Sequence, residues 1–204
     1  MANLEKTIDA LKKNNINVLR FQTGAEAKDA ALKMIPGGSS VAFGGSATTA
    51  QIGLMDALRS GGYNLIDAYA SGVPREEAVE RRRLGLLADY FITGTNAITE
   101  SGELVNIDGL GNRVAAQIFG PRKVFIFASE KKIVPDVKEA FMRIEKIAAP
   151  LNAKRLGIDV PCVRGESCLE CPPERTLCKY EVVIRRQSLP ERMTIFLIAE
   201  DLGY

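Results

Sequence analysis

Short apolar segments alternate with amphipathic segments along nearly the whole chain of 204 residues. The apolar segments have the length of strands, whereas the others place apolar residues three or four positions apart, as helices do. The predicted strands cover residues 17–21, 40–43, 63–69, 89–94, 123–129, 181–186 and 194–200, and the predicted helices cover 4–13, 23–34, 47–59, 76–87, 111–119 and 133–150. This alternation predicts an α/β fold with a Rossmann-like, mainly parallel sheet flanked by helices. No repeat or low-complexity linker divides the sequence, so we expect a single domain over residues 1–204.

Three local patterns add detail to this prediction. Thr23 is followed three residues later by Glu26, which is typical of a capping box at the start of a helix. Residues 98–109 alternate around Ser101 and Gly102, which predicts a hairpin. Pro150 is expected to end the helix over residues 133–150, because proline cannot continue a helix interior.

The composition excludes several classes of chemistry. The chain has no histidine, so Ser-His or Cys-His catalytic pairs and imidazole metal ligands are excluded. Its 27 basic and 25 acidic residues give a net charge of +2, and 6% of its residues are aromatic, which argues against a nucleic-acid partner. The N-terminal residues carry charges where a secretory signal needs an apolar core, and the longest apolar runs are too short to cross a bilayer. We therefore expect a cytoplasmic protein without a membrane partner.

The first candidate ligand-binding loop follows the predicted strand over residues 40–43. In open α/β sheets, ligands bind at the carboxyl ends of strands, where a helix follows. Glycines let backbone N–H groups approach an anion, and hydroxyl groups add donors. The candidate residues are Gly44, Gly45, Ser46, Thr48 and Thr49. The loop matches neither a Walker A motif nor a dinucleotide fingerprint, and a tight turn with a Ser or Thr helix cap is an alternative of equal weight.

The second candidate loop follows the predicted strand over residues 89–94 and continues after the hairpin, over residues 106–113. Its polar side chains alternate with glycines, which provides several hydrogen-bond donors and a permissive backbone. Asn, Asp and Gly also build turns, so a purely structural role is the alternative, and both roles are compatible. The candidate ligand-binding residues are Gly94, Thr95, Asn96, Asn106, Gly109, Asn112 and Arg113, and Asp108 is a candidate catalytic carboxylate.

Two groups of basic residues are expected to lie in water. Arg81, Arg82 and Arg83 follow glutamates at helical spacing, which favours a solvated helix face over a phosphate site. Lys131 and Lys132 follow a buried strand, and their long side chains are expected to reach solvent.

All four cysteines lie in a loop over residues 161–179, with the spacing C-x5-C-x2-C-x6-C. In a reducing cytosol this clustering indicates metal binding or redox chemistry before structural disulfides. Cys162, Cys168, Cys171 and Cys178 are therefore candidate ligands of zinc or of an iron–sulfur cluster. The spacing matches neither the common zinc-ribbon pattern nor the ferredoxin pattern. Reduced or reversibly oxidised thiols and simple burial are the alternatives.

The stretch ADYFITGTNAITESGELVNIDGLGNRVAAQIFGPRKVFIFAS over residues 88–129, together with the cysteine segment PCVRGESCLEC, resembles the LUD domain. This is the family of lactate utilization protein C and related small proteins. The resemblance implies a cytoplasmic bacterial or archaeal protein with the NagB/RpiA/CoA transferase-like fold. Some relatives act within an iron–sulfur lactate-oxidising system, so iron–sulfur lactate utilization proteins are implied as partners.

The wider superfamily offers two comparisons. The stretch TGTNAITESGELVN is similar to a pocket loop of methylthioribose-phosphate isomerase, which makes Gly94, Asn96, Gly102 and Asn106 candidate ligand contacts. Asn96 stands where those enzymes have a catalytic Asp, which argues against isomerase activity. Residues 99–102 also resemble the Ser-Glu-Asn-Gly motif of CoA transferases, which implies that Glu100 could form an acyl-thioester. An ordinary hairpin has the same appearance.

Three hypotheses follow. In the first, the protein binds an anionic small molecule, such as an organic acid, a phosphorylated metabolite or a CoA-type ligand, in lactate or organic-acid utilization. In the second, it is an enzyme related to CoA transferases or phosphosugar isomerases, with Glu100 or Asp108 as the catalytic carboxylate. In the third, it is a redox or interaction subunit that uses the cysteine segment. The sequence leaves the oligomeric state open, a homo-oligomer included.

Overall fold

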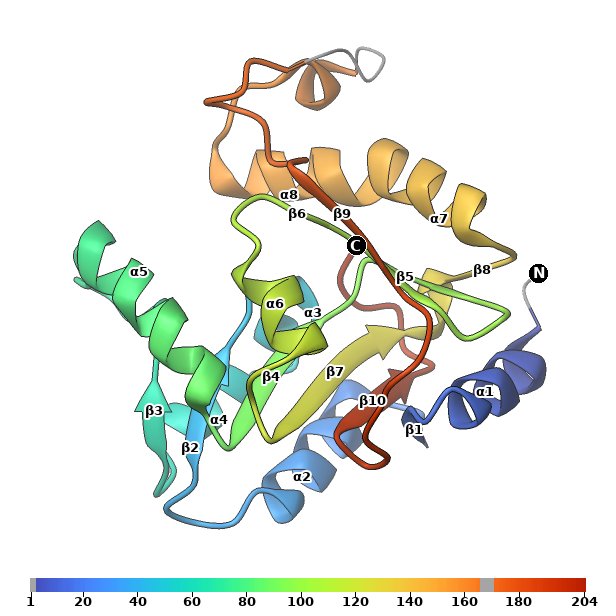
Figure 1. The fold of residues 1–204 in the computed structure, drawn as a ribbon. Coiled ribbons are helices and arrows are strands. Elements are labelled where there is room, and N and C mark those ends of the chain that lie inside the picture. Colours follow the sequence, from blue (N-terminus) through green and yellow to red (C-terminus); the bar gives the residue numbers. More distant parts are fainter. Residues whose placement is uncertain (1–2, 166–170) are drawn as a thin grey trace.

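The computed structural model describes residues 3–165 and 171–204. Six strands form a sheet at the centre of the molecule (Figure 1). In spatial order they are β1 (Asn17–Phe21), β10 (Met193–Ile198), β7 (Lys123–Ser129), β4 (Tyr90–Gly94), β2 (Ser40–Phe43) and β3 (Asn64–Ile66). Every neighbouring pair is parallel. The predicted α/β fold with a mainly parallel sheet is therefore confirmed.

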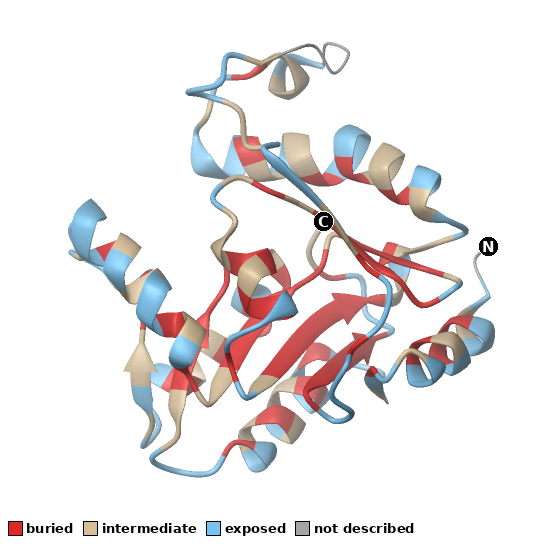
Figure 2. Cartoon of the chain, viewed as in Figure 1, coloured by how far each residue is buried: buried red, intermediate tan, exposed pale blue. Residues whose placement is uncertain are grey.

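The central strands are buried on both of their faces (Figure 2, red). Ile195 and Leu197 of β10 belong to one apolar cluster, whereas Phe196 and Ile198 belong to another. This alternation follows from the two-residue period of a strand, which places successive side chains on opposite faces. A strand covered on both faces needs a continuous apolar run, as β7 and β10 have.

Helices cover both faces of this sheet. On one face, α1 (Leu4–Lys13) and α6 (Asn112–Ile118) pack through side chains such as Leu11 and Ala116. On the other, α2 (Gly24–Met34) and α4 (Leu54–Arg59) pack through side chains such as Ala27 and Leu58. The predicted capping box at the start of α2 is confirmed, since Thr23 and Glu26 each accept a hydrogen bond from the other's backbone N–H.

A smaller, four-stranded sheet begins where the central strands end (Figure 1). Its spatial order is β8 (Ile133–Val134), β5 (Ala97–Thr99), β6 (Leu104–Asp108) and β9 (Tyr180–Ile184). Strands β5 and β6 form the predicted antiparallel hairpin, and β5 follows β4 after only two residues. Helices α7 (Val137–Arg143) and α8 (Ala149–Leu156), joined by the π-helical turn η3 (Ile144–Ala148), pack over this sheet. The second sheet therefore brings its side chains to the carboxyl edge of the first.

Two predicted helices differ from the observed ones. The helix predicted over residues 47–59 is divided into α3 (Ala47–Gln51) and α4, because Gly53 adopts a φ of 67° that ends the first helix. The prediction that Pro150 ends a helix is wrong. Pro150 instead lies in the first turn of α8, directly after the π-helical turn η3, so the helical path continues past the proline through this wider turn.

One further helix and three 3-10 turns complete the described helical elements. They are α5 (Arg75–Leu84) and the 3-10 turns η1 (Gly85–Leu87), η2 (Glu130–Lys132) and η4 (Pro161–Arg164). Within residues 3–165 and 171–204, no helix combines the length and the apolar character that a membrane span requires.

Candidate functional site

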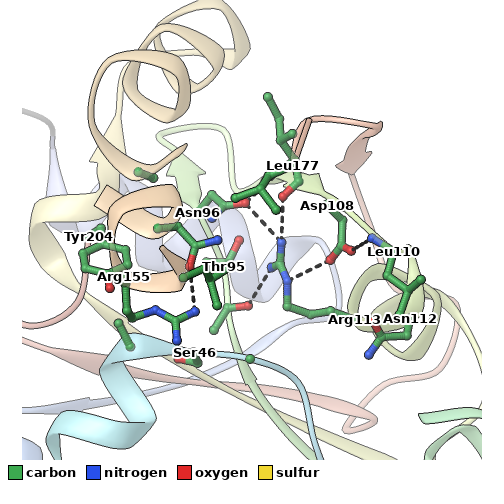
Figure 3. Close-up of a pocket in the computed structure, with 18 of the residues that line it drawn as sticks. Ser46, Thr95, Asn96, Asp108, Leu110, Asn112, Arg113, Arg155, Leu177 and Tyr204 are labelled. Atoms are coloured by element: carbon green, nitrogen blue, oxygen red, sulfur yellow. Dashed lines mark hydrogen bonds and ion pairs between the residues drawn. The ribbon is translucent and has the colours of Figure 1, made fainter. Parts of the chain in front are cut away.

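Loops from three neighbouring strand ends enclose a cavity of about 290 Å³ (Figure 3). One loop follows β2, one follows β4, and one connects β6 to α6. The carboxyl ends of the parallel strands β2 and β4 share one edge of the central sheet. The antiparallel strand β6 of the second sheet brings the third loop to the same edge. Side chains of α8, with Leu177 and Tyr204, also line the cavity. The predicted site residues that line it are Gly45, Ser46, Gly94, Thr95, Asn96, Asp108, Gly109, Asn112 and Arg113.

Arg113 is the buried centre of this site (Figure 3). Its Nε donates to Oδ2 of Asp108 at 3.0 Å, and Nη1 donates to Oδ1 of Asn106 at 2.6 Å and to the carbonyl of Gly94 at 3.2 Å. Its Nη2 donates to Oδ1 of Asn96 and to the carbonyl of Ile107. Burial lowers the pKa of Arg113, although the Asp108 carboxylate partly offsets this effect. All five N–H groups are engaged, so Arg113 gives the cavity a fixed positive charge rather than free donors.

Asp108 shapes the loop between β6 and α6. Its Oδ1 accepts hydrogen bonds from the backbone N–H groups of Leu110 and Gly111, at 3.1 and 2.8 Å. Its Oδ2 accepts the bond from Arg113. Because both carboxylate oxygens already have partners within the protein, the observed geometry gives Asp108 a structural role in holding Arg113 and the loop.

A buried polar network lies beneath the cavity. The side-chain amide of Asn106 donates to Oε1 of Gln117 at 3.1 Å, and Nε2 of Gln117 donates to the carbonyl of Gly94 at 3.1 Å. Both side chains are fully buried. Since a satisfied buried network fixes its members in one arrangement, Asn106 orients Arg113 from below. Gln117 lies on α6, where a polar residue is ordinarily expected to face solvent. No pattern in the neighbouring sequence predicts that it is buried in this network.

The loop after β2 is fixed by two other interactions. Ser46 caps α3, because its hydroxyl oxygen accepts a hydrogen bond from the N–H of Thr49. Gly44 leaves no room for a side chain, since a Cβ there would lie 2.7 Å from Oγ1 of Thr93. Gly44, Thr48 and Thr49 thus support the cavity, while Gly45 and Ser46 line it. The turn with a Ser cap and the cavity wall coexist in this loop.

Lys132 is the main residue that the sequence analysis placed wrongly. Its side chain is buried rather than solvated, with 5% of the residue exposed, and it lines the cavity. Its Nζ lies 3.3 Å from Oγ1 of Thr48 and 3.2 Å from the carbonyl oxygen of Thr95. Burial is the largest cause that lowers the pKa of Lys132, which is about 7. The positive charges of Arg143, Arg113 and Lys131 lower it further. The available signal was its position three residues after β7, at the edge where ligands bind.

Two more arginines face the cavity (Figure 3 labels Arg155). Arg155 of α8 is exposed and donates from Nη2 to Oδ1 of Asn152 at 2.7 Å. Arg82 of α5, expected on a solvated face, lies 5.2 Å from the ring centre of Tyr69 and lines the cavity. The cavity therefore has an excess of basic side chains, an arrangement that favours a negatively charged group.

Glu100 and Gly102 lie outside the cavity, in the turn between β5 and β6. Glu100 accepts hydrogen bonds from Nζ of Lys6 at 2.8 Å and from the backbone N–H of Asn3 at 2.9 Å. These two donors lower the pKa of the Glu100 carboxyl. Gly102 has a φ of 80°, and a Cβ there would lie 2.7 Å from backbone atoms of Ala10 and Leu11. In this structure both residues attach the hairpin to α1.

Replacing Gly102 by alanine is expected to cost about 3 kcal/mol of unfolding free energy, because left-handed strain adds to a backbone clash. Gly38→Ala is the matched control. Gly38 has a similar φ of 77° but has no atom near the added Cβ, so only the strain of about 1 kcal/mol applies. Urea unfolding of both variants measures the two costs. Equal losses of unfolding free energy would mean that the backbone of α1 does not clash with a side chain at position 102.

Nearly the whole sequence matches the model of one known protein family. The model of the LUD domain matches residues 4–198. The chain belongs to the LUD domain family. No curated protein sequence matches it.

Several solved structures are similar to this LUD domain. A DUF162 family protein from Deinococcus radiodurans is 14% identical, with a TM-score of 0.55, and the match covers 96% of this chain and 95% of that one. Ribose 5-phosphate isomerase A from Methanocaldococcus jannaschii is 17% identical over 70% of this chain and 66% of its own, with a TM-score of 0.38. eIF2B beta from Chaetomium thermophilum is 14% identical over 57% and 44%, with a TM-score of 0.39. The first of these supports the same architecture over nearly the whole LUD domain.

The cysteine segment of this LUD domain borders the cavity. Cys162 lies on η4, Cys171 and Cys178 lie in the segment before β9, and Cys168 lies outside the described residues. Leu177, next to Cys178, lines the cavity. Among the described residues, no three Cys, Asp or Glu side chains are grouped as metal ligands would be. The metal site at the four cysteines stays a prediction.

Proposed function

We propose that this LUD domain binds a small anionic metabolite in the cavity at the carboxyl edge of its parallel sheet. The observation that carries the proposal is the charge of the cavity wall. The positively charged side chains of Arg82, Arg113 and Arg155 line it, and Asp108 supplies the one carboxylate side chain among the described lining residues. Asp108 is already paired with Arg113. A bound carboxylate or phosphate would offset the remaining positive charge.

The free donors of the site lie near its mouth. The guanidinium of Arg155 has one hydrogen bond, to Asn152, and therefore keeps several N–H groups for a ligand. The side chain of Asn112 has no hydrogen bond to any other described residue and also lines the cavity. Arg113, whose donors are all used, would contribute through its charge alone. We therefore expect Arg155 to contact the anionic group directly.

The size of the cavity favours a small ligand. Ligand pockets commonly enclose about 300–1,000 Å³, and this cavity of about 290 Å³ lies at the lower end. An organic acid or a small phosphorylated metabolite suits this volume better than a CoA-type ligand. The resemblance to lactate utilization proteins supports an organic acid, and a role in lactate or organic-acid utilization is part of this proposal.

Sulfate binding measured by titration calorimetry tests the proposal, because sulfate keeps its charge across the neutral pH range. Arg155→Gln is expected to weaken sulfate binding about tenfold, the loss of one charge-assisted contact. Lys154→Gln is the matched control. Lys154 is the neighbouring exposed cation on α8 but does not line the cavity, so its loss should leave the affinity within about twofold.

Two results would contradict this function. The first is the absence of measurable sulfate binding by the wild-type protein. The second is an equal loss of affinity in Arg155→Gln and Lys154→Gln, because that would indicate general attraction to a basic surface rather than binding in the cavity.

A further inference from the structure

The amine of Lys132 is placed like a reactive group rather than an ion-pair partner. It projects from η2, at the end of the central strand β7, into the wall of the cavity. Within the described residues it forms no ion pair with a carboxylate, and its two hydrogen-bond partners are a hydroxyl and a carbonyl. Buried lysines usually need a counter-ion. The lack of one here favours an uncharged amine.

The number of partners fits a neutral amine. A protonated lysine has three N–H donors, whereas a neutral one has two and a lone pair. The two acceptors, Oγ1 of Thr48 and the carbonyl of Thr95, match the two N–H groups. The surroundings act in the same direction, since Arg113, Arg143 and Lys131 are the charges that act on this amine and all three are positive. Their repulsion and the burial lower the pKa of Lys132, which leaves the lone pair available at neutral pH.

We propose that Lys132 is a catalytic nucleophile that forms an imine with a small carbonyl compound carrying a carboxylate or phosphate group. This inference rests on the proposed function, because the anionic group would be held by the basic wall of the same cavity. The nitrogen of Lys132 attacks the carbonyl carbon, and the electron pair of the C=O bond moves to oxygen. The oxygen then leaves as water with the two protons of the amine, and a C=N bond remains. The step needs no oxidant and no reductant.

Reductive trapping tests the proposal on the full chain. The protein is incubated with glyoxylate and cyanoborohydride at about pH 7.5, where ordinary lysines with a pKa of about 10.4 are protonated. Cleavage after glutamate gives a peptide of residues 131–139, which holds Lys132 together with the exposed Lys131 and Lys138. Lys132 is expected to be labelled at least about tenfold faster than these two internal controls. Labelling at equal rates, or only at surface lysines and the N-terminal amine, would overturn the proposal.

Two further probes test the substrate class. Glycolaldehyde phosphate carries a phosphate where glyoxylate carries a carboxylate, and glycolaldehyde carries no charge. Whichever anion the cavity prefers, at least one charged probe should label Lys132 faster than glycolaldehyde does, while surface lysines show no such preference. Equal rates with all three probes at Lys132 would refute an anionic substrate.

The Lys132→Gln variant tests the site of labelling, and sulfate binding separates the imine proposal from the proposed function. Glutamine can still donate two N–H groups to the partners of Lys132, but it has no nucleophilic amine, so fast labelling of peptide 131–139 should be lost. A wild-type protein that binds sulfate but forms no adduct at Lys132 would refute the imine and leave the proposed function standing. A protein that binds no sulfate in the cavity would refute the function itself.

Discussion

Replacing Arg113 by alanine is expected to lower the unfolding free energy by about 3–5 kcal/mol, the range for removing one partner of a buried ion pair. The guanidinium satisfies oxygens of Asp108, Asn106, Asn96, Gly94 and Ile107. Without it, the carboxylate of Asp108 stays buried without its cation. Urea unfolding measures the loss, and calorimetry should show that the variant no longer binds sulfate.

Two further variants locate the origin of that cost. Arg186→Ala removes an exposed arginine and should change the unfolding free energy by less than about 0.5 kcal/mol. In the Arg113→Ala background, Asp108→Asn should recover part of the loss, because it removes the unpaired buried charge. A loss below about 1 kcal/mol for Arg113→Ala would mean that the buried network does not stabilise the fold.

Replacing Lys132 by methionine is expected to change stability in a way that depends on pH. The pKa of Lys132 is about 7 in the folded protein and about 10.4 in the unfolded chain. Between these pH values the unfolded chain binds more protons, so the stability of the wild-type protein rises with pH. Below about pH 7 both states are protonated, and the full cost of the buried charge applies.

The methionine variant lacks this cost at every pH. The difference in unfolding free energy between the variant and the wild type should therefore depend on pH. It should favour the variant more at pH 6.5 than at pH 9.5, by on the order of a few kcal/mol. Methionine leaves Thr48 and the carbonyl of Thr95 without a donor, but that loss is the same at both pH values and cancels in the comparison. Lys138→Met is the control, because Lys138 is an exposed lysine of α7 and its charge is not among those that act on Lys132. A difference between Lys132→Met and the wild type that does not change with pH would show that Lys132 has an ordinary pKa.

The central sheet could be predicted because its information is local. Segments such as VFIFA and IFLIA are long enough and apolar enough to be strands buried on both faces. The loops after β2 and β4 could also be predicted as neighbours, since parallel strands end at one edge of the sheet. The loop after β6 joins them because the hairpin that follows β4 returns to the same edge. Most of the candidate ligand-binding residues accordingly line or support one cavity.

The remaining features depend on tertiary packing. Glu100 lies in a hairpin whose sequence resembles an active-site motif, but the turn is directed toward α1, where Lys6 pairs with it. Lys132 and Gln117 are long polar residues that are usually exposed. Here they are buried because α6, η2 and the second sheet converge on the end of the central one. No local pattern encodes that convergence, and the only signal for the burial of Lys132 was its position after β7.

An amide NMR titration with sulfate tests the central claim, anion binding at the carboxyl edge of the sheet, most directly. Anion binding in the cavity should give saturable shifts concentrated in residues 45–47, 94–96 and 109–113, the backbone that borders the cavity. The sulfate concentration that half-saturates these shifts should rise about tenfold in Arg155→Gln, which removes the arginine expected to contact the anion. Shifts that never saturate, or that are scattered over exposed lysines and arginines far from this edge, would contradict the account.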